Sequence, residues 1–590
     1  MSKFILVDHS LKGVGGHHYE YAAHVLSAAE RAGYAPVLAT HRRFRPGRDY
    51  SRYWPTWPIF RYTTYSKFTV YRSQPHRDAS GAGRIAGRWN LSGVGERVKD
   101  FLYRRGREKR VAAMAAGLAR LFARESVAAG DQVFVPTLSE LDLEGVVRFL
   151  EATPSTQVAD WHLQFHYNIF DGREPEFAAQ AGKLDVMREA FAAALARTPN
   201  HRLHFYNTTE QLAAQYERMG LAAFHALPYP VNEALARRDE DGAADASGEI
   251  VATPRPLRIA CLGAIRPEKG AAELAGVVEA LWDSHFLPGR CQLVVQSNKR
   301  RFRLPLPVDD ADELPEGVEP VVYAPHPLPM ETYVELIRAA DIGLLLYDSR
   351  RYYARCSGVL VELLSVGTPV IATAGCWMAE QLAEANFAHL DGALRELKRV
   401  RCIDMGGVQV PGGSRDVVTD VEVPRTATHA MCSFRWRFPS EAGTYVRVSL
   451  ESPCDEEQES TGPSFILGRR AGDGLVRAMF PVDPSANRVR LRWENAYDSG
   501  PIALADVQID LLSAQHLPGA TYPFGAVGLV AADDSQVAPL VDDMVAHWLH
   551  YRRTALEFAQ GWSAFHNADR IVAELAQRTR TSTSHGLSAA

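Results

Sequence analysis

The 590-residue sequence predicts an α/β fold with two doubly wound parallel-sheet units and an antiparallel β-sandwich inserted in the C-terminal half. Three observations predict it. Short apolar runs alternate with helical patterns over residues 4–228 and again over 257–373, as parallel sheets with helical crossovers require. A polar, small-residue linker, 231–256, separates the two stretches. Period-two alternation over 403–514, broken by turn residues, is typical of antiparallel strands.

The first unit, residues 1–230, opens with a strand, a glycine-bearing loop and a helix. Phe4–Val7 is apolar, Gly15 and Gly16 end the loop, and a helical pattern runs from about His18 to Gly33. This order begins a βαβ unit. The two glycines allow a ligand to approach the backbone. The loop lacks the G-x-G-x-x-G spacing, which argues against a dinucleotide site.

A basic, aromatic-rich insertion is predicted within this unit at 42–110. It holds about 18 Lys or Arg against about five acids, interleaved with tyrosine and tryptophan. Such a segment could contact an anionic membrane surface, a lipid-diphosphate acceptor or an acidic glycan. It could equally be a solvated insertion whose aromatic side chains pack on the first unit. No nucleic-acid-binding motif accompanies it.

The second unit is predicted over 257–400 and 515–545, on either side of the sandwich at 403–514. The helical stretch at 546–576 follows it, and the tail at 577–590 is low in apolar residues, which predicts disorder. This order places the sandwich inside the second unit.

The predicted sandwich has the shape of many carbohydrate-binding modules, although a fold does not fix a function. Trp436 and Trp493 could be sugar platforms or core residues. The core interpretation is favoured, because both lie on alternating apolar segments.

The overall composition of the chain does not point to any one class of binding partner. The net charge of −5 gives no pull toward nucleic acid. The seven cysteines lack C-x-x-C spacing, so neither a zinc site nor a disulfide framework is indicated. The N-terminal apolar run is too short for a signal peptide, and no run of about 18 apolar residues occurs. We therefore expect a cytoplasmic protein, with peripheral contact at the inner membrane face through 42–110 as an option.

The strongest chemical signal is the run YYARCSGVLVELLSVGTPVIAT, residues 352–373. A polar loop leads into a helix that begins near Ser357 and Gly358. The free N–H groups and dipole of its first turn suit a diphosphate. About one turn on, Glu362 could accept hydrogen bonds from the hydroxyls of a ribose. An N-capped helix with a solvated glutamate is equally consistent with the spacing.

Two further segments carry candidate ligand-binding side chains. The run LGAIRPEKG places Arg266 and Lys269 where a strand-to-helix loop meets the predicted cleft, and such cations can neutralise a leaving diphosphate. A loop with this composition is also common on protein surfaces. In WHLQFHYNIF, His162 and His166 flank a strand end, where parallel sheets bind ligands. One of the two is expected to face the cleft.

Together these segments resemble the retaining family 4 glycosyltransferases of the GT-B fold. The pattern Y-x-R-x-S-G-V-x-x-E is filled here by residues that include Tyr353, Arg355, Ser357, Gly358 and Glu362. The pattern R-x-E-K-G is filled by residues that include Arg266 and Lys269. The resemblance covers about four fifths of the chain and leaves out the sandwich. It implies that the two Rossmann-like domains face each other across a cleft, with the acceptor on the first, the donor on the second, and the last helices crossing back.

The resemblance also implies individual roles. Arg266 and Lys269 would contact the donor phosphates, and His166 would bond the donor sugar. The loop with Gly15 and Gly16 would lie over the cleft near the phosphates. Sequence alone does not separate His166 from a structural role.

One position departs from the family pattern. The family usually has a glutamate where this chain has Ala354, so Tyr353 or Arg355 would contact the sugar instead. We see no D-x-D motif in a plausible site. We therefore expect no metal, and no cofactor beyond a UDP- or GDP-type sugar substrate.

The predicted activity is retaining transfer of a sugar to an acceptor hydroxyl, in polysaccharide or glycoconjugate synthesis. The leaving diphosphate would accept the acceptor's proton. Two alternatives stay open: a nucleotide-sugar epimerase on the same fold, which needs no acceptor, and a non-catalytic glycan-binding protein that uses the sandwich. Retention of Arg266, Lys269 and Glu362 argues against the second alternative.

Overall fold

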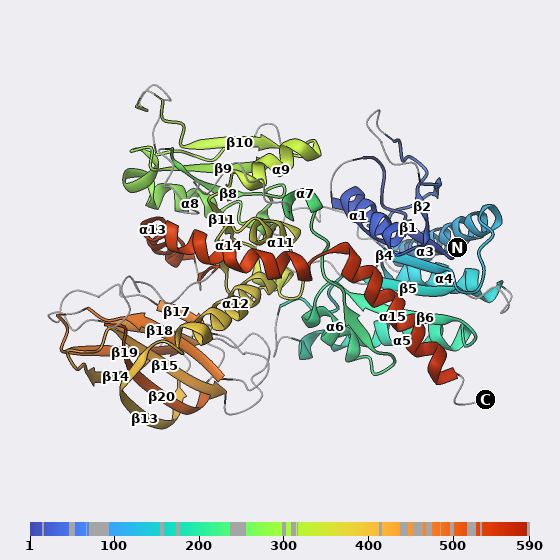
Figure 1. The fold of residues 1–590 in the computed structure, drawn as a ribbon. Helices are drawn as coiled ribbons and strands as arrows, with labels where there is room; N and C mark the ends of the chain where they lie inside the picture. Colours follow the sequence, from blue (N-terminus) through green and yellow to red (C-terminus); the bar gives the residue numbers. More distant parts are fainter. Residues whose placement is uncertain are drawn as a thin grey trace.

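The computed structural model shows two parallel α/β units and a pair of antiparallel sheets in one chain (Figure 1). The residues it describes are 1–590 except 15–16, 47–53, 66–67, 70–93, 154–158, 173–176, 237–254, 298–301, 308–313, 316, 412–415, 437–445, 452–463, 468–474, 484, 496–500, 516–526, 532–533 and 587–590.

The first unit is a seven-stranded parallel sheet of order β3-β2-β1-β4-β5-β6-β7. Its strands are β1 (Lys3–Asp8), β2 (Ala35–His41), β3 (Thr56–Phe60), β4 (Gln132–Leu138), β5 (Asp160–Phe165), β6 (Arg202–Asn207) and β7 (Phe224–Ala226). Its helices are α1 (His17–Arg31), α3 (Val94–Arg124), α4 (Glu140–Glu151), α5 (Ala181–Arg197) and α6 (Glu210–Glu217).

Side-chain alternation on β1 explains the two faces of this sheet. Phe4 and Leu6 pack in a cluster with α1 and the last helix of the chain. Ile5 and Val7 pack on the opposite face in a cluster with α3, α4, α5 and α6. Helices therefore cover both faces, which is why the four central β1 side chains, Phe4–Val7, are all apolar.

The second unit is a six-stranded parallel sheet of order β10-β9-β8-β11-β12-β21. Its strands are β8 (Leu257–Cys261), β9 (Cys291–Ser297), β10 (Val321–Pro325), β11 (Ile342–Leu345), β12 (Val370–Thr373) and β21 (Gly528–Ala531). Its helices are α8 (Glu273–Ala280), α9 (Met330–Arg338), α10 (Ser349–Tyr352), α11 (Gly358–Ser365), α12 (Trp377–Ala393) and α13 (Val537–Ala546). The order and crossovers of both sheets confirm the predicted fold class.

Two four-stranded antiparallel sheets lie between α12 and β21, of orders β13-β20-β15-β18 and β14-β19-β16-β17. Their strands are β13 (Lys398–Val410), β14 (Asp416–Glu422), β15 (His429–Trp436), β16 (Val446–Glu451), β17 (Ser464–Leu467), β18 (Leu475–Pro481), β19 (Arg488–Asn495) and β20 (Ile502–Ser513). The first strand pairs with the last, and Lys398 lies opposite Ser513.

Apolar side chains of both antiparallel sheets share one buried cluster. Phe434 and Val476 come from one sheet, and Val448 and Leu491 from the other. Trp493 is fully buried in the same cluster, so it is a core residue and no sugar platform. The side chain of Trp436 lies outside the described residues.

The last helices return to the first unit. α14 (Trp548–Phe565) packs on α11, where the Trp562 indole N–H donates to the Val361 carbonyl at 3.1 Å. α15 (Ala568–Gly586) then crosses to α1, as Figure 1 shows. The predicted disorder at 577–590 is wrong up to Gly586. Thr579, which hydrogen-bonds Gln132 on β4 and the Leu575 carbonyl, helps hold the helix there.

The structure corrects two further segment predictions. Residues 42–110 are no simple insertion, because β3 is an edge strand of the first sheet and α3 begins at Val94. Much of the basic segment, including 70–93, lies outside the described residues. The predicted linker at 231–256 starts as the short helix α7 (Glu233–Ala236), since Val231 and Leu235 are buried against the second unit.

Candidate functional site

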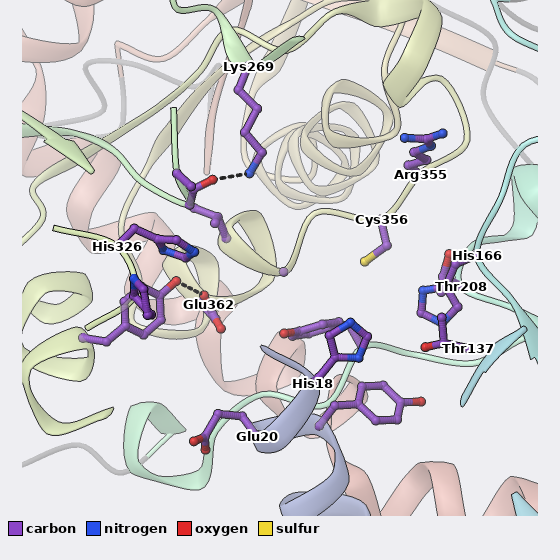
Figure 2. A pocket seen from close by; sticks show the side chains of 18 of the residues that line it. His18, Glu20, Thr137, His166, Thr208, Lys269, His326, Arg355, Cys356 and Glu362 are labelled. Atoms are coloured by element: carbon purple, nitrogen blue, oxygen red, sulfur yellow. Dashed lines mark hydrogen bonds between the residues drawn. The ribbon is translucent and has the colours of Figure 1, made fainter. Parts of the chain in front are cut away.

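A cavity of about 520 Å³ lies between the two parallel units. Both sheets direct the carboxyl ends of their strands toward it, which is where open α/β sheets bind ligands. Residues at or just after the carboxyl ends of β1, β4, β5 and β6 line one wall, and residues at or just after the ends of β8, β9, β10 and β11 line the other. Figure 2 shows the side chains that converge there.

The start of α11 forms part of the second-unit wall. Ser357 caps this helix by accepting a hydrogen bond from the Leu360 amide at 3.3 Å, so its hydroxyl is already engaged. Gly358 lines the cavity itself. A Cβ at Gly358 would lie 2.8 Å from the Tyr229 ring, so a larger residue would have to displace that ring. The helix thereby presents its N-terminal dipole to the cavity.

Glu362 projects from α11 into the same cavity, one turn further on. The Tyr333 hydroxyl donates to its carboxylate at 2.6 Å (Figure 2). Burial raises the pKa of Glu362 to about 7, and the nearby Glu20 acts in the same direction. The carboxyl therefore changes charge near neutral pH. A group that donates a hydrogen bond to the ionised carboxylate would lower this pKa.

This pKa predicts a pH-dependent difference between the wild type and a Glu362→Gln variant. The folded protein holds the Glu362 proton up to about pH 7, whereas the ordinary value is 4.5. Stability from the protonated carboxyl is therefore complete below the unfolded pKa and is lost as the pH rises through the folded pKa. Urea unfolding from about pH 5 to 8 should show the wild type losing stability relative to the variant. A constant difference would contradict the prediction.

Lys269 and Arg266 lie beside the start of α11. The Lys269 ammonium donates to the Gly263 carbonyl at 2.7 Å and sits 4.9 Å from the centre of the Tyr347 ring. Burial lowers the pKa of Lys269. Arg266 is more exposed and lies 3.5 Å from Glu268. Both side chains line the cavity, as the sequence predicts.

The backbone geometry requires a glycine at position 270, the last residue of the run LGAIRPEKG. Gly270 has a φ of 81°, and a Cβ there would lie 2.5 Å from the Leu346 carbonyl oxygen. Only glycine allows the turn Pro267–Lys269 to close against β11, and the turn sets the position of Lys269.

The predicted ligand-binding residues of the loop before α11 lie in two different environments. Arg355 lines the cavity. Tyr353 does not: it is 3% exposed and packs edge-on against Phe177 in the core of the first unit. Ala354 is fully buried in the same cluster. Tyr353 therefore packs between the two units and is not among the residues that line the cavity.

Hydrogen bonds to the backbone carbonyls of this loop fix it to the first unit. The Thr209 hydroxyl donates to the Ala354 carbonyl at 2.6 Å, and the Gly172 amide donates to the Arg350 carbonyl at 2.8 Å. A glutamate at 354 would be buried among apolar side chains, which explains why this chain has alanine there.

The two histidines of the first unit separate clearly. His162 is fully buried between Tyr206 and Gln132, at 3.0 and 2.6 Å, and is structural. His166 follows β5 and lines the cavity. Burial lowers the pKa of His166 to about 4, so the ring is neutral at pH 7. Gly15 and Gly16 lie outside the described residues.

Several residues that line the cavity lie outside the motifs that predict the site. On the second unit, Gln296 accepts a hydrogen bond from the Gly263 amide at 2.8 Å, and His326 lines the cavity nearby. On the first unit, Asp8 and His18 form a hydrogen-bonded pair at 3.0 Å. Asp8 ends the first strand and His18 starts the first helix, so their position at a strand end was the available signal.

Among the described residues, no group of three or more His, Cys, Asp or Glu side chains is arranged to hold a metal ion. Within the same described ranges, every helix is too short or too polar to cross a membrane.

A scan of protein-family models and a search of curated proteins found no match. Solved structures do resemble the chain. Sucrose-phosphate synthase from Thermosynechococcus elongatus is 14% identical, with a TM-score of 0.36, over 65% of this chain and 84% of that one. The trehalose-6-phosphate synthase OtsA is 11% identical, with a TM-score of 0.42, over 65% and 87%. WaaG, a glycosyltransferase involved in lipopolysaccharide biosynthesis, is 16% identical, with a TM-score of 0.34, over 65% and 84%.

Proposed function

We propose that this chain is a retaining glycosyltransferase that moves a sugar from a nucleoside-diphosphate sugar to an acceptor hydroxyl. One observation carries the proposal: two cations, a helix N-terminus and a carboxyl converge on one wall of the cavity. Arg266, Lys269 and the start of α11 at Gly358 complement a diphosphate, and Glu362 complements the hydroxyls of a ribose. A nucleoside diphosphate carries both a diphosphate and a ribose in one molecule.

The same groups would serve the chemistry. The bond between the sugar C1 and the diphosphate oxygen breaks, and a bond from C1 to the acceptor oxygen forms. Arg266, Lys269 and the α11 dipole stabilise the charge that develops on the leaving diphosphate. That diphosphate takes the acceptor's proton, which agrees with the retention that the family resemblance implies. His166, neutral and facing the cavity, would bind the donor sugar.

The proposal includes a UDP- or GDP-type donor, a glycan or lipid-linked acceptor, and a role in polysaccharide or glycoconjugate synthesis on the cytoplasmic side. It also includes peripheral membrane contact through the start of α3. Phe101 and Leu102 are 61% and 57% exposed there, next to the exposed Arg104 and Arg105. Arg107 is excluded from this role, because it donates to the Phe68 carbonyl and lies 3.5 Å from Glu140.

A thermal-shift panel of UDP, GDP, ADP and their sugars tests the donor site. A ligand that binds only the folded state raises the melting temperature. We expect one nucleotide family to stabilise the wild type and to lose most of that effect in Glu362→Ala, which removes the ribose contact. If no nucleotide shifts the wild type, the proposed function is wrong.

Two further measurements separate the alternatives. Conversion of a nucleotide sugar into its epimer without any acceptor would favour an epimerase. Binding of glycans without nucleotide binding would favour a glycan-binding protein. Its site would then be the groove of about 710 Å³ on the sheet of β13, β20, β15 and β18, which Arg399, Arg435 and Asp506 help to line.

A further inference from the structure

The outer face of the sheet β13-β20-β15-β18 carries a second hollow, a groove of about 710 Å³. Side chains alternate between the two faces of a strand, and Phe434 and Val476 lie in the core that the two antiparallel sheets share. Their sequence neighbours Ser433 and Arg477 therefore face outward, and both line the groove. The groove and the cavity between the parallel units have no lining residue in common.

One row of polar side chains crosses all four strands of this face. The register pairs Asp404 on β13 with Gln508 on β20. Gln508 pairs in turn with Ser433 on β15, and Ser433 pairs with Arg477 on β18. All four residues line the groove. Because neighbouring strands are about 4.8 Å apart, the row offers hydrogen-bond donors and acceptors over roughly 14 Å.

Irregular strand pairing lies beside this row. The register shifts between Asp404 and Gly406 on β13, and again between Ser433 and Arg435 on β15. Gly406 and Asp506 both have a positive φ, of 64° and 53°. Such irregularities bend a strand and redirect side chains, which accounts for the hollow on this face. They also bring Asp506 to 3.5 Å from Arg435 within the groove.

The charges that line the groove balance each other. Three arginines and three aspartates line it: Arg399, Arg435, Arg477, Asp404, Asp506 and Asp510. A surface with equal numbers of both charges does not attract a ligand of one particular sign. The groove therefore recognises its ligand through hydrogen bonds and apolar contacts, and it suits a ligand without net charge.

Some polar groups of the groove have hydrogen-bonding capacity that the described residues do not use. Asp510 is 2% exposed, and its Oδ1 atom lies 3.1 Å from Nε of Arg399 but accepts no hydrogen bond from a described residue. In the same part of the chain, no hydrogen bond engages the side chains of Ser433 and Gln508. A buried acceptor without a donor is destabilising, so a ligand that donates here is favoured. Arg399 is 61% exposed, which allows it to move aside.

The outer face of the other antiparallel sheet is built differently. Arg490 lies 2.9 Å from Asp420 there, and Arg492 lies 2.6 Å from Glu451. These pairs between neighbouring strands neutralise the charges within the protein. The groove differs from this solvated face in its hollow shape and in its buried, unused acceptor.

Apolar side chains complete the lining of the groove. Met431 and Leu512 are 5% and 4% exposed and form part of its floor. Leu394 and Leu397, which follow α12, and Leu475 on β18 also line it. Sites for small molecules typically combine such apolar walls with a few polar groups that fix the orientation of the ligand.

We infer that this groove is a carbohydrate-binding site, and that its ligand is an uncharged glycan chain. A sugar ring carries several hydroxyls side by side, and each hydroxyl both donates and accepts. One ring can donate to Asp510 and Asp506, accept from Arg435 and place its C–H groups against the leucines. A peptide fits less well, because peptides pair with the edge of a sheet and this groove lies on a face. The inference goes beyond the proposed function, because it adds a second carbohydrate site outside the cavity.

An array of immobilised probes tests the class of ligand with the full chain. It carries hexasaccharides of glucose, galactose, mannose and N-acetylglucosamine, a hexasaccharide of galacturonate, and hexapeptides of serine and of asparagine. We expect an uncharged hexasaccharide to bind with a Kd below about 1 mM, and about tenfold more tightly than its monosaccharide, because the groove spans four strands. If no uncharged hexasaccharide binds, or if galacturonate or a peptide binds more tightly, the inference is wrong.

Paired variants then locate the bound glycan by calorimetry. Arg435→Ala/Asp506→Asn removes one ion pair from the groove, and asparagine tolerates the positive φ at that position. We expect this variant to bind the glycan about tenfold more weakly. The matched control, Arg490→Ala/Asp420→Asn, removes a similar pair from the outer face of the other sheet and should bind like the wild type. Equal affinity in the groove variant and the wild type, at an unchanged melting temperature, would overturn the inference.

Nucleotide binding, measured in the same samples, separates this inference from the proposed function. Because the groove and the cavity have no lining residue in common, both variants should bind nucleotide like the wild type. Saturating nucleotide should leave the glycan affinity unchanged. A glycan that nucleotide displaces would lie in the cavity, which would overturn the inference. A wild type that binds the glycan in the groove but binds no nucleotide would overturn the proposed function alone.

Discussion

Replacing Lys269 by alanine should weaken binding of the nucleoside diphosphate about 100-fold. The Lys269 side chain is half-buried at the cavity wall, and its ammonium is already held by a hydrogen bond to the Gly263 carbonyl. A hydrogen bond from a charged donor to a phosphate contributes about 1.5–3 kcal/mol, and its loss leaves the phosphate charge uncompensated. Turnover should fall further, by about 10²–10³, because charge grows on the diphosphate as the glycosidic bond breaks.

Calorimetry with the selected nucleotide and single-turnover kinetics would measure the two losses separately. Lys269→Met is the matched control for packing, since it keeps most of the unbranched apolar stem and removes the ammonium group with its charge and hydrogen-bond donors. Burial lowers the pKa of Lys269, so the charge is costly in the folded state and its removal should not lower the melting temperature. Nucleotide affinity within threefold of the wild type in both variants would show that Lys269 does not contact the phosphates.

Replacing Gly528 by alanine should destabilise the protein by more than about 3 kcal/mol. Gly528 opens β21, where the chain re-enters the second parallel sheet, and it pairs with Val370 on β12. A Cβ at this position would lie 1.9 Å from the Val370 carbonyl oxygen, and the φ of 155° is rarely adopted by residues with a side chain. Backbone atoms cannot move aside as a flexible side chain can, so the two strands must separate.

Urea unfolding followed by circular dichroism would measure this loss. Gly276→Ala is the control, because Gly276 lies inside α8 and a Cβ there meets nothing within 4 Å. Alanine in that helix should stabilise the protein by about 0.5–1 kcal/mol. A Gly528→Ala protein with the same urea midpoint as the wild type would contradict the close packing of β12 and β21.

Local periodicity predicted the two parallel sheets because each strand and helix buries a face that the sequence itself displays. The prediction of a disordered tail failed because the sequence of the tail displays no such apolar face. The segment after Gln577 has few apolar residues, yet α15 continues through it to Gly586, and contacts such as that between Thr579 and Gln132 come from a strand nearly 450 positions away. Composition does not encode a partner that lies so far off in the chain.

The candidate site was predictable where a motif forces a backbone shape. Gly358 and Gly270 each sit against another segment that excludes a side chain, and the motif therefore marks their position. Tyr353 was not predictable, because its neighbour Arg355 faces the cavity while Tyr353 enters the core of the other unit. His162 and His166 were inseparable in sequence, since strand alternation ends at Phe165.

The pairing of Lys398 with Ser513 has a consequence for how this chain can be shortened or lengthened. The two antiparallel sheets leave and rejoin the second unit through neighbouring positions on β13 and β20. Their entire length therefore stands where a surface loop would otherwise connect α12 to β21. A few residues can bridge the same gap without stretching the parallel sheet, since domains with adjacent ends tolerate removal and exchange. The two antiparallel sheets can in this sense be removed as a unit, and a different domain can be grafted between α12 and β21.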